Sequence, residues 1–232
     1  MDLSSFPTGG GLPAHARVLR WRPGLGGAQH SEIFAPGNEG SGAAVALALA
    51  LALDAAAADE ARSLLWVQDK AALRLTGRPY RPGLPASLRS RVIHVAAARP
   101  EDALFALEEG LRCRDLAGVI GEIAGNPRAL DFTASRRLAL AAERHGTPLF
   151  LVRLDAARDL SAARMRWQVR AAPSPPPRWN AQAPGRPAWR AELFRARVHP
   201  PGEWILHRDE KTGLIASAAT APDRTEARVA GL

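Results

Sequence analysis

The hydrophobic positions of this chain fall into short apolar runs that are separated by longer amphipathic segments. The runs are short, nearly continuous and bounded by polar or turn-forming residues, which is typical of buried strands in a layered sheet. Five strands are predicted on this basis, at residues 63–69, 91–97, 116–123, 147–154 and 165–171.

Two of the intervening segments have the pattern of helices. In residues 99–113, Leu104, Leu107 and Leu111 recur at helical spacing, and a proline and two acids precede them in the first turn. Residues 131–146 begin at an Asp or Thr cap candidate and end at a glycine, which are common helix start and stop signals. A third helix is predicted at the apolar run of residues 43–53, which is too short to span a bilayer.

Strands and helices therefore alternate across residues 30–171. This alternation predicts an α/β fold with a mostly parallel sheet flanked by helices. We divide the rest of the chain by composition into a loose N-terminal segment (1–29), a Pro-rich linker (172–187), a C-terminal β extension (188–220) and a disordered tail (221–232). The extension is expected to form a β-hairpin or a three-stranded unit, and packing of this unit on the main sheet is left open.

The stretch "EIFAPGNEGSGAAVALALALAL" (32–53) has the layout of a phosphate-binding loop between a strand and a helix. In a GxxxxGK[ST] loop, backbone N–H groups wrap the phosphates, the Lys neutralises them and the hydroxyl holds Mg²⁺. Two registers fit, one through Gly37 and Gly42 and one through Ala35 and Gly40. Neither supplies a cation, and the two lysines of the chain, Lys70 and Lys211, are distant in sequence. We therefore expect a degenerate, inactive loop and no bound cofactor.

Composition narrows the class of protein further. The formal net charge is +8, and a single cysteine excludes an internal disulfide, which fits a reducing compartment. The N-terminus lacks the charged and apolar regions of a secretory signal, so a cytoplasmic location without membrane contact is expected. The six histidines show no metal-ligand spacing, so no metal site is predicted.

Basic residues concentrate between residues 153 and 197. This span contains ten arginines and only three acids, and tryptophans are interleaved among them. This combination suits phosphate contact with base stacking, and it suits a protein interface equally well. A purely structural alternative is that the tryptophans pack the linker on the sheet while the arginines are solvated. The candidate contact residues are Arg164, Arg166, Trp167, Arg170, Trp189, Arg190, Arg195 and Arg197.

Two acids end predicted strands at the edge where α/β sheets bind ligands, Asp69 and Glu122. Many ATPases of this architecture hold a catalytic acid at such positions. Because the loop lysine is missing, we expect these two carboxylates to cap or hydrogen-bond instead. No catalytic triad is visible, and no catalytic residue is assigned.

The order of these motifs resembles a known family. "HSEIFAPGNEGSGAAVALALA" is similar to the phosphate-loop segment of RecA/SulA-like proteins, and "LWVQDKAAL" is similar to the following RecA strand. Together with "LFALEEGLRCRDLAGVIGEI", "LDFTASRRLALAAERHGTPLFLVR", "MRWQVRAAPS" and "RPAWRAELFRAR", they resemble the ImuA family over about residues 28–218.

This resemblance implies a RecA-like core and a role in SOS-induced translesion synthesis and mutagenesis. ImuA-type proteins act with ImuB, a catalytically impaired relative of Y-family polymerases, and with an error-prone C-family polymerase. DNA and RecA are further candidate partners, which implies association with the nucleoid. Polymerisation belongs to the partner, so the resemblance implies an accessory or scaffold protein rather than an enzyme.

Two alternatives remain open at this point. The chain could be a RecA-like, DNA-binding ATPase whose loop cation is supplied by an arginine elsewhere. It could also be a SulA-like inhibitor of cell division, which shares the core and the missing lysine. The long basic C-terminal region has no evident use in the second role.

Overall fold

The computed structural model describes residues 30–37, 41–56, 60–209 and 213–218, apart from residues 175, 178 and 181. The predicted N-terminal segment and C-terminal tail lie outside these ranges. The elements, in chain order, are β1 (His30–Ala35), α1 (Ser41–Ala55), β2 (Ser63–Asp69), α2 (Lys70–Thr76), the 3-10 turn η1 (Arg81–Gly83), β3 (Val92–Ala97), α3 (Pro100–Arg112), β4 (Leu116–Ala124), α4 (Phe132–His145), β5 (Leu149–Leu154), β6 (Met165–Ala172), β7 (Ala188–Ala196), β8 (Gly202–Asp209) and β9 (Gly213–Ala218).

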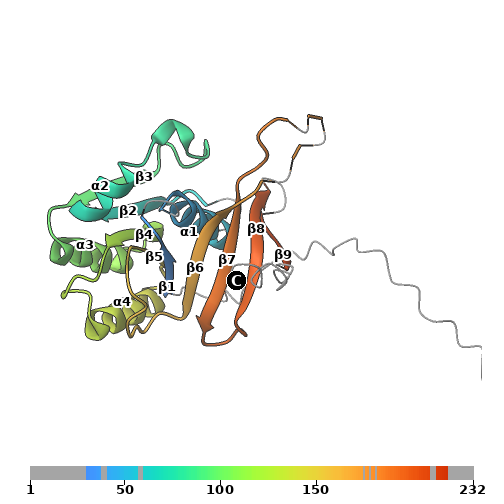
Figure 1. Ribbon diagram of the computed structural model, residues 1–232. Coiled ribbons are helices and arrows are strands. Elements are labelled where there is room, and N and C mark those ends of the chain that lie inside the picture. The colour runs from blue at the N-terminus through green and yellow to red at the C-terminus, as the bar shows by residue number, and fades with distance from the viewer. Residues whose placement is uncertain are drawn as a thin grey trace, which may run out of the picture.

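All of these strands join one sheet, in the order β3-β2-β4-β5-β1-β6-β7-β8-β9. The pairs from β3 to β6 are parallel, whereas β7, β8 and β9 are added antiparallel. The structure thus confirms the predicted α/β fold with a mostly parallel sheet and a terminal β-hairpin. Figure 1 shows β6, β7 and β8 extending the sheet beyond helices α3 and α4.

The helices cover the sheet from both sides. On one face, α1 packs on the central strands, and Leu47 and Leu51 are fully buried there beside Trp66 and Trp167. On the other face, α3 and α4 bury Leu107 and Leu138, among others, in a second apolar cluster. Because parallel strands are buried on both faces, they appear in the sequence as continuous apolar runs.

Local signals explain where the helices start and stop. The Asp131 carboxylate accepts the N–H of Ala134 at 2.7 Å and so caps α4, and Gly146 ends this helix with φ 72°. Helix α3 begins at Pro100 with two acids in its first turn, as predicted. Helix α2 was not predicted, because its seven residues are too few to establish a helical period.

The Pro-rich segment 172–187 connects two neighbouring antiparallel strands. Strand β6 ends at Ala172 and β7 starts at Ala188, and these two residues are paired in the ladder. The β extension therefore continues the main sheet instead of standing apart from it. This arrangement fixes the basic C-terminal region against the core and decides which of its side chains reach the surface.

Candidate functional site

The degenerate phosphate loop starts at Gly37, two residues after the end of β1. Residues 38–40, and with them the candidate Gly40, lie outside the described residues. The backbone N–H of Gly37 donates to the carboxylate of Asp155 at 2.7 Å, and the N–H of Asp155 donates to the carbonyl of Ala35 at 3.1 Å. A Cβ atom on Gly37 would lie 2.5 Å from the other Asp155 oxygen. The Asp155 carboxylate thus already accepts the hydrogen bond that the Gly37 N–H could otherwise donate to a bound anion.

The other glycine of this register, Gly42, lies in the first turn of α1 and has open space around it. The side chains that follow it, Ala43 and Ala44, are buried in the core and carry no polar group. A helix N-terminus attracts anions through its free N–H groups. Without a cation or a hydroxyl after Gly42, however, the described part of this loop offers no group to neutralise a triphosphate or to hold Mg²⁺.

Removing the Asp155 carboxylate gives a test of this closed arrangement. Asp155→Ala is expected to lower the free energy of unfolding by about 1 kcal/mol, because it deletes the bond to Gly37 and places alanine at φ 50°. Asp155→Asn keeps an acceptor oxygen and tolerates this φ, so it should lose less. Urea unfolding of both variants checks the prediction. Equal stability of the alanine variant and the wild type would show that the contact stabilises nothing.

The two acids at the carboxyl edge of the sheet are engaged inside the protein. Asp69 caps α2, since its Oδ1 accepts the N–H of Ala72 at 2.6 Å, while its Oδ2 is buried without a hydrogen-bond partner among the described residues. Glu122 accepts Trp66 Nε1 at 2.5 Å and the Thr76 hydroxyl at 2.8 Å. Burial raises the pKa of both carboxyls. The contacts agree with the capping and hydrogen-bonding roles expected from the sequence.

Three of the eight residues predicted to contact a partner or nucleic acid are buried in the structure. Trp167 is fully buried, Trp189 is 6% exposed and Arg166 is 4% exposed. Side chains alternate between the two faces of a strand, and in β6 and β7 both tryptophans point to the face that α1 covers. The two tryptophans pack in the core and Arg166 is buried, so none of the three is an exposed contact residue as the sequence predicted.

Arg166 instead belongs to a buried ionic cluster around Glu32, which was not among the residues predicted from the sequence. The Glu32 carboxylate accepts Arg166 Nε at 2.7 Å and the Ser161 hydroxyl at 2.9 Å, and it lies 3.8 Å from Arg153 Nη1. Burial lowers the pKa of Arg153, and the nearby Glu32 charge opposes this shift. Both guanidinium groups also lie over the ring of Phe34, at 5.1 and 5.7 Å. A Glu within the apolar strand "EIFA" was the available signal for this cluster.

The remaining arginines reach the surface at two places. Arg170 and Arg190 lie on the exposed face of β6 and β7, where Arg190 pairs with Glu203 at 2.9 Å and the neighbouring Arg158 lies 3.4 Å from Glu192. Acids thus offset two of the positive charges here. Arg164, Arg195 and Arg197 gather at the other end of the same strands, where the charge is less balanced.

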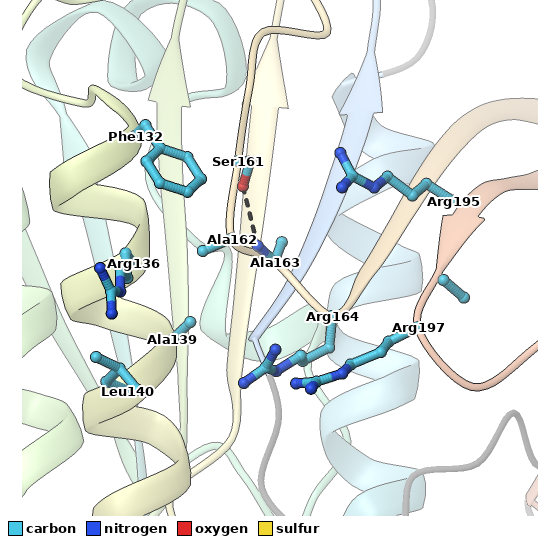
Figure 2. A pocket seen from close by; sticks show the side chains of 11 residues that line it. Phe132, Arg136, Ala139, Leu140, Ser161, Ala162, Ala163, Arg164, Arg195 and Arg197 are labelled. Carbon is cyan, nitrogen blue, oxygen red and sulfur yellow. Dashed lines mark hydrogen bonds between the residues drawn. The ribbon is translucent and has the colours of Figure 1, made fainter.

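We call this second place the arginine groove. It has a volume of about 540 Å³ and lies between α4, the segment before β6 and the end of β7 (Figure 2). Its lining residues are Phe132, Arg136, Ala139, Leu140, Ser161, Ala162, Ala163, Arg164, Arg195, Ala196 and Arg197. Arg136 was not among the residues predicted from the sequence.

Hydrogen bonds fix the walls of the groove relative to each other. The hydroxyls of Ser135 on α4 and Ser161 lie 2.7 Å apart, and Ser135 also accepts the N–H of Ala162 at 2.9 Å. The N–H of Arg197 donates to the carbonyl of Arg164 at 3.0 Å, which keeps the two arginines side by side, as Figure 2 shows. The walls of the arginine groove are therefore fixed by hydrogen bonds, and Ser161 connects them to the buried Glu32.

Other kinds of site find no support in the described ranges. No group of three or more His, Cys, Asp or Glu side chains is placed there to hold a metal ion. None of the helices in these ranges is both long enough and apolar enough to cross a membrane.

Comparison with known proteins gives one consistent result. No protein-family model matches the chain. The chain is similar to Protein ImuA of Caulobacter vibrioides, in strains NA1000/CB15N and ATCC 19089/CB 15, with 34% identity over 158 residues in each case. The aligned region covers 64% of this chain, and it spans 61% of the length of these curated relatives.

Proposed function

We propose that this chain, a relative of Protein ImuA, is a non-catalytic accessory protein of damage-inducible mutagenesis. It acts in SOS-induced translesion DNA synthesis together with an ImuB-like relative of Y-family polymerases and an error-prone C-family polymerase, in the cytoplasm at the nucleoid. The observation that carries the proposal is the similarity to Protein ImuA over 158 residues.

Two features of the site support an accessory role over ATP hydrolysis. The phosphate loop has no lysine, and alanines follow Gly42 where a metal-binding hydroxyl would be required. Asp155 already binds the N–H of Gly37, and its negative charge repels a phosphate at this point. At the end of β7, Arg195 and Arg197 are exposed and make no ion pair with a described residue, which suits binding to a partner.

Affinity purification from the native host tests the proposal. The tagged chain is recovered after DNA damage, and the proteins that accompany it are identified by mass spectrometry. Recovery of a Y-family-like protein and a C-family polymerase is the expected result. Recovery of the cell-division GTPase in their place, or of no polymerase, would overturn the proposal.

A charge-reversal variant tests which surface is used. Replacing Arg190, Arg195 and Arg197 by Glu should weaken partner binding at least about tenfold, because favourable charge pairs become repulsive while the fold is kept. All three side chains are exposed. Affinities are compared by surface plasmon resonance with the recovered partner immobilised.

The matched control for this variant carries the same three charge changes elsewhere. Arg74, Arg78 and Arg114 are exposed and make no ion pair with a described residue, so their replacement by Glu changes the net charge equally. Equal loss of binding in both triple variants would indicate a general effect of net charge and would contradict the assignment of the C-terminal strands.

A further inference from the structure

The charge of the arginine groove is largely uncompensated. Arg164 pairs with Glu143, whereas Arg136, Arg195 and Arg197 make no ion pair with any residue that the structure describes. These side chains come from opposite walls, since Arg136 lies on α4 whereas Arg195 lies in β7 and Arg197 directly follows it (Figure 2). Guanidinium groups on two sides of a groove are suited to hold carboxylates or phosphates between them.

Between the arginines, the groove is apolar. Phe132 and Leu140 are 49% and 50% exposed, although both are large hydrophobic side chains. They share one stripe of α4 with Arg136 and Ala139, because positions four, seven and eight residues apart lie on the same face of a helix. All four residues line the groove, and all but the buried Ala139 are exposed, whereas Leu138 and Ala142 belong to the apolar cluster beneath the helix. Exposed apolar side chains with a polar rim mark a binding surface.

Two observations favour a short ligand over a nucleic acid. Phe132 is the one aromatic side chain among the lining residues, whereas binding of single strands relies on stacking platforms for successive bases. Helix α3, which packs beside α4, carries four carboxylates against one arginine, and its Glu108 pairs with Arg137 of α4 at 2.9 Å. Because Arg99, Arg112 and Arg137 pair with three of these carboxylates, a long polyanion that continued past α4 would meet no unpaired cation on α3.

We propose that the arginine groove binds an acidic peptide segment of a partner protein, with one apolar side chain seated between Phe132 and Leu140. Carboxylates on both sides of this anchor pair with Arg136 on one wall and with Arg195 and Arg197 on the other. The volume of about 540 Å³ falls within the range of ligand pockets, roughly 300–1,000 Å³. The inference rests on the proposed function in one respect, which is that the partner protein belongs to the mutagenesis machinery.

The test uses a defined peptide and the purified full-length chain. A fluorescein-labelled peptide with one phenylalanine flanked on both sides by aspartates is titrated, and binding is followed by fluorescence anisotropy. We expect saturable binding that weakens about tenfold or more when serine replaces the phenylalanine. Arg136→Glu combined with Arg197→Glu should weaken binding by a similar factor or more, and Leu140→Ser should reproduce the effect of the serine peptide.

A matched control separates the groove from the overall charge. Arg114→Glu with Arg128→Glu alters two exposed arginines outside the groove and should leave peptide affinity within about twofold of the wild type. Equal weakening by both double variants, or equal affinity for the phenylalanine and serine peptides, would overturn the proposal. Tighter binding of an oligo-dT strand of matched charge, lost in the groove variant, would assign the groove to DNA instead.

The peptide experiment and the affinity purification test the groove assignment and the proposed function separately. If polymerases accompany the chain from the host but the groove variant still recovers them, the proposed function stands and the groove assignment is wrong. If the peptide binds in the groove but no polymerase is recovered, the groove assignment stands and the partner belongs to another process.

Discussion

Replacing Glu32 with glutamine is expected to lower the free energy of unfolding by about 3–5 kcal/mol, because a buried ion pair that loses one partner leaves a buried charge uncompensated. Glu32 is fully buried, and two arginines, Arg153 and Arg166, depend on its single negative charge. Arg166 is itself only 4% exposed and cannot turn into solvent. A loss of this size is a large part of the stability of an ordinary domain.

Urea unfolding followed by tryptophan fluorescence measures this effect. Glu203→Gln is the matched control, because Glu203 also pairs with an arginine at 2.9 Å but at the surface, where the pair contributes at most about 1 kcal/mol. Arg166→Met in the Glu32→Gln background should recover part of the loss, since it removes the charge that was left unpaired. If Glu32→Gln changes the unfolding free energy by less than about 1 kcal/mol, the cluster does not hold this region together.

The Glu32 cluster also links the fold to the arginine groove. Ser161 donates to Glu32 and lies 2.7 Å from Ser135 of α4, and the N–H of Arg164 donates to the carbonyl of His30 at 2.8 Å. Arginine side chains of the groove are thus positioned by the same buried contacts that hold β1 to β6. A Glu32 variant that remains folded should therefore also bind the acidic peptide less tightly.

Much of the fold could be predicted because its parallel strands are buried on both faces. The runs 63–69 and 116–123 match β2 and β4 to within one residue, since a central strand leaves a continuous apolar signal. The ends of α4 were also predictable, because Asp131 and Gly146 are explicit capping residues. Strand order and register carry no such local signal, so whether the C-terminal strands join the main sheet could not be decided from the sequence.

The candidate site was harder to predict, because it is assembled by strand order and packing, which leave no local signal in the sequence. Composition singled out the basic C-terminal third, but exposure there depends on which neighbouring elements cover each side chain of β6 and β7. Arg166 and Arg195 are paired across the two strands, yet one is buried against Glu32 and the other is exposed in the groove. Arg136 lies far from this region in the sequence and joins it only because α4 packs next to the segment before β6.

Acidification is expected to destabilise the protein through His30, whose ring is fully buried at the start of β1. Burial, mainly, and the charges of Arg153, Arg166 and Arg164 lower the pKa of His30 to about 4, while Glu32 opposes this shift. The unfolded chain binds a proton near pH 6.5 and the folded chain does not. The stabilisation is therefore complete above pH 6.5 and is lost as pH falls to about 4, with a size of about 3 kcal/mol.

Comparing the wild type with His30→Phe isolates this contribution. Neither ring nitrogen of His30 has a hydrogen-bond partner among the described residues, so an aromatic replacement of similar shape forfeits no hydrogen bond there. Unfolding free energies are measured in urea at neutral pH and near pH 4. Between these conditions the wild type should lose about 3 kcal/mol more than the variant.

The variant comparison is needed because other buried groups act in the opposite direction. Burial raises the pKa of Asp69 and of Glu122, so acidification through their titration range stabilises the folded state and masks part of the His30 effect in the wild type. Both carboxyls are present in His30→Phe and cancel in the difference. If the unfolding free energies of the two proteins change with pH in parallel, His30 takes up a proton as readily in the folded as in the unfolded state. This result would contradict a buried, uncharged ring at this position.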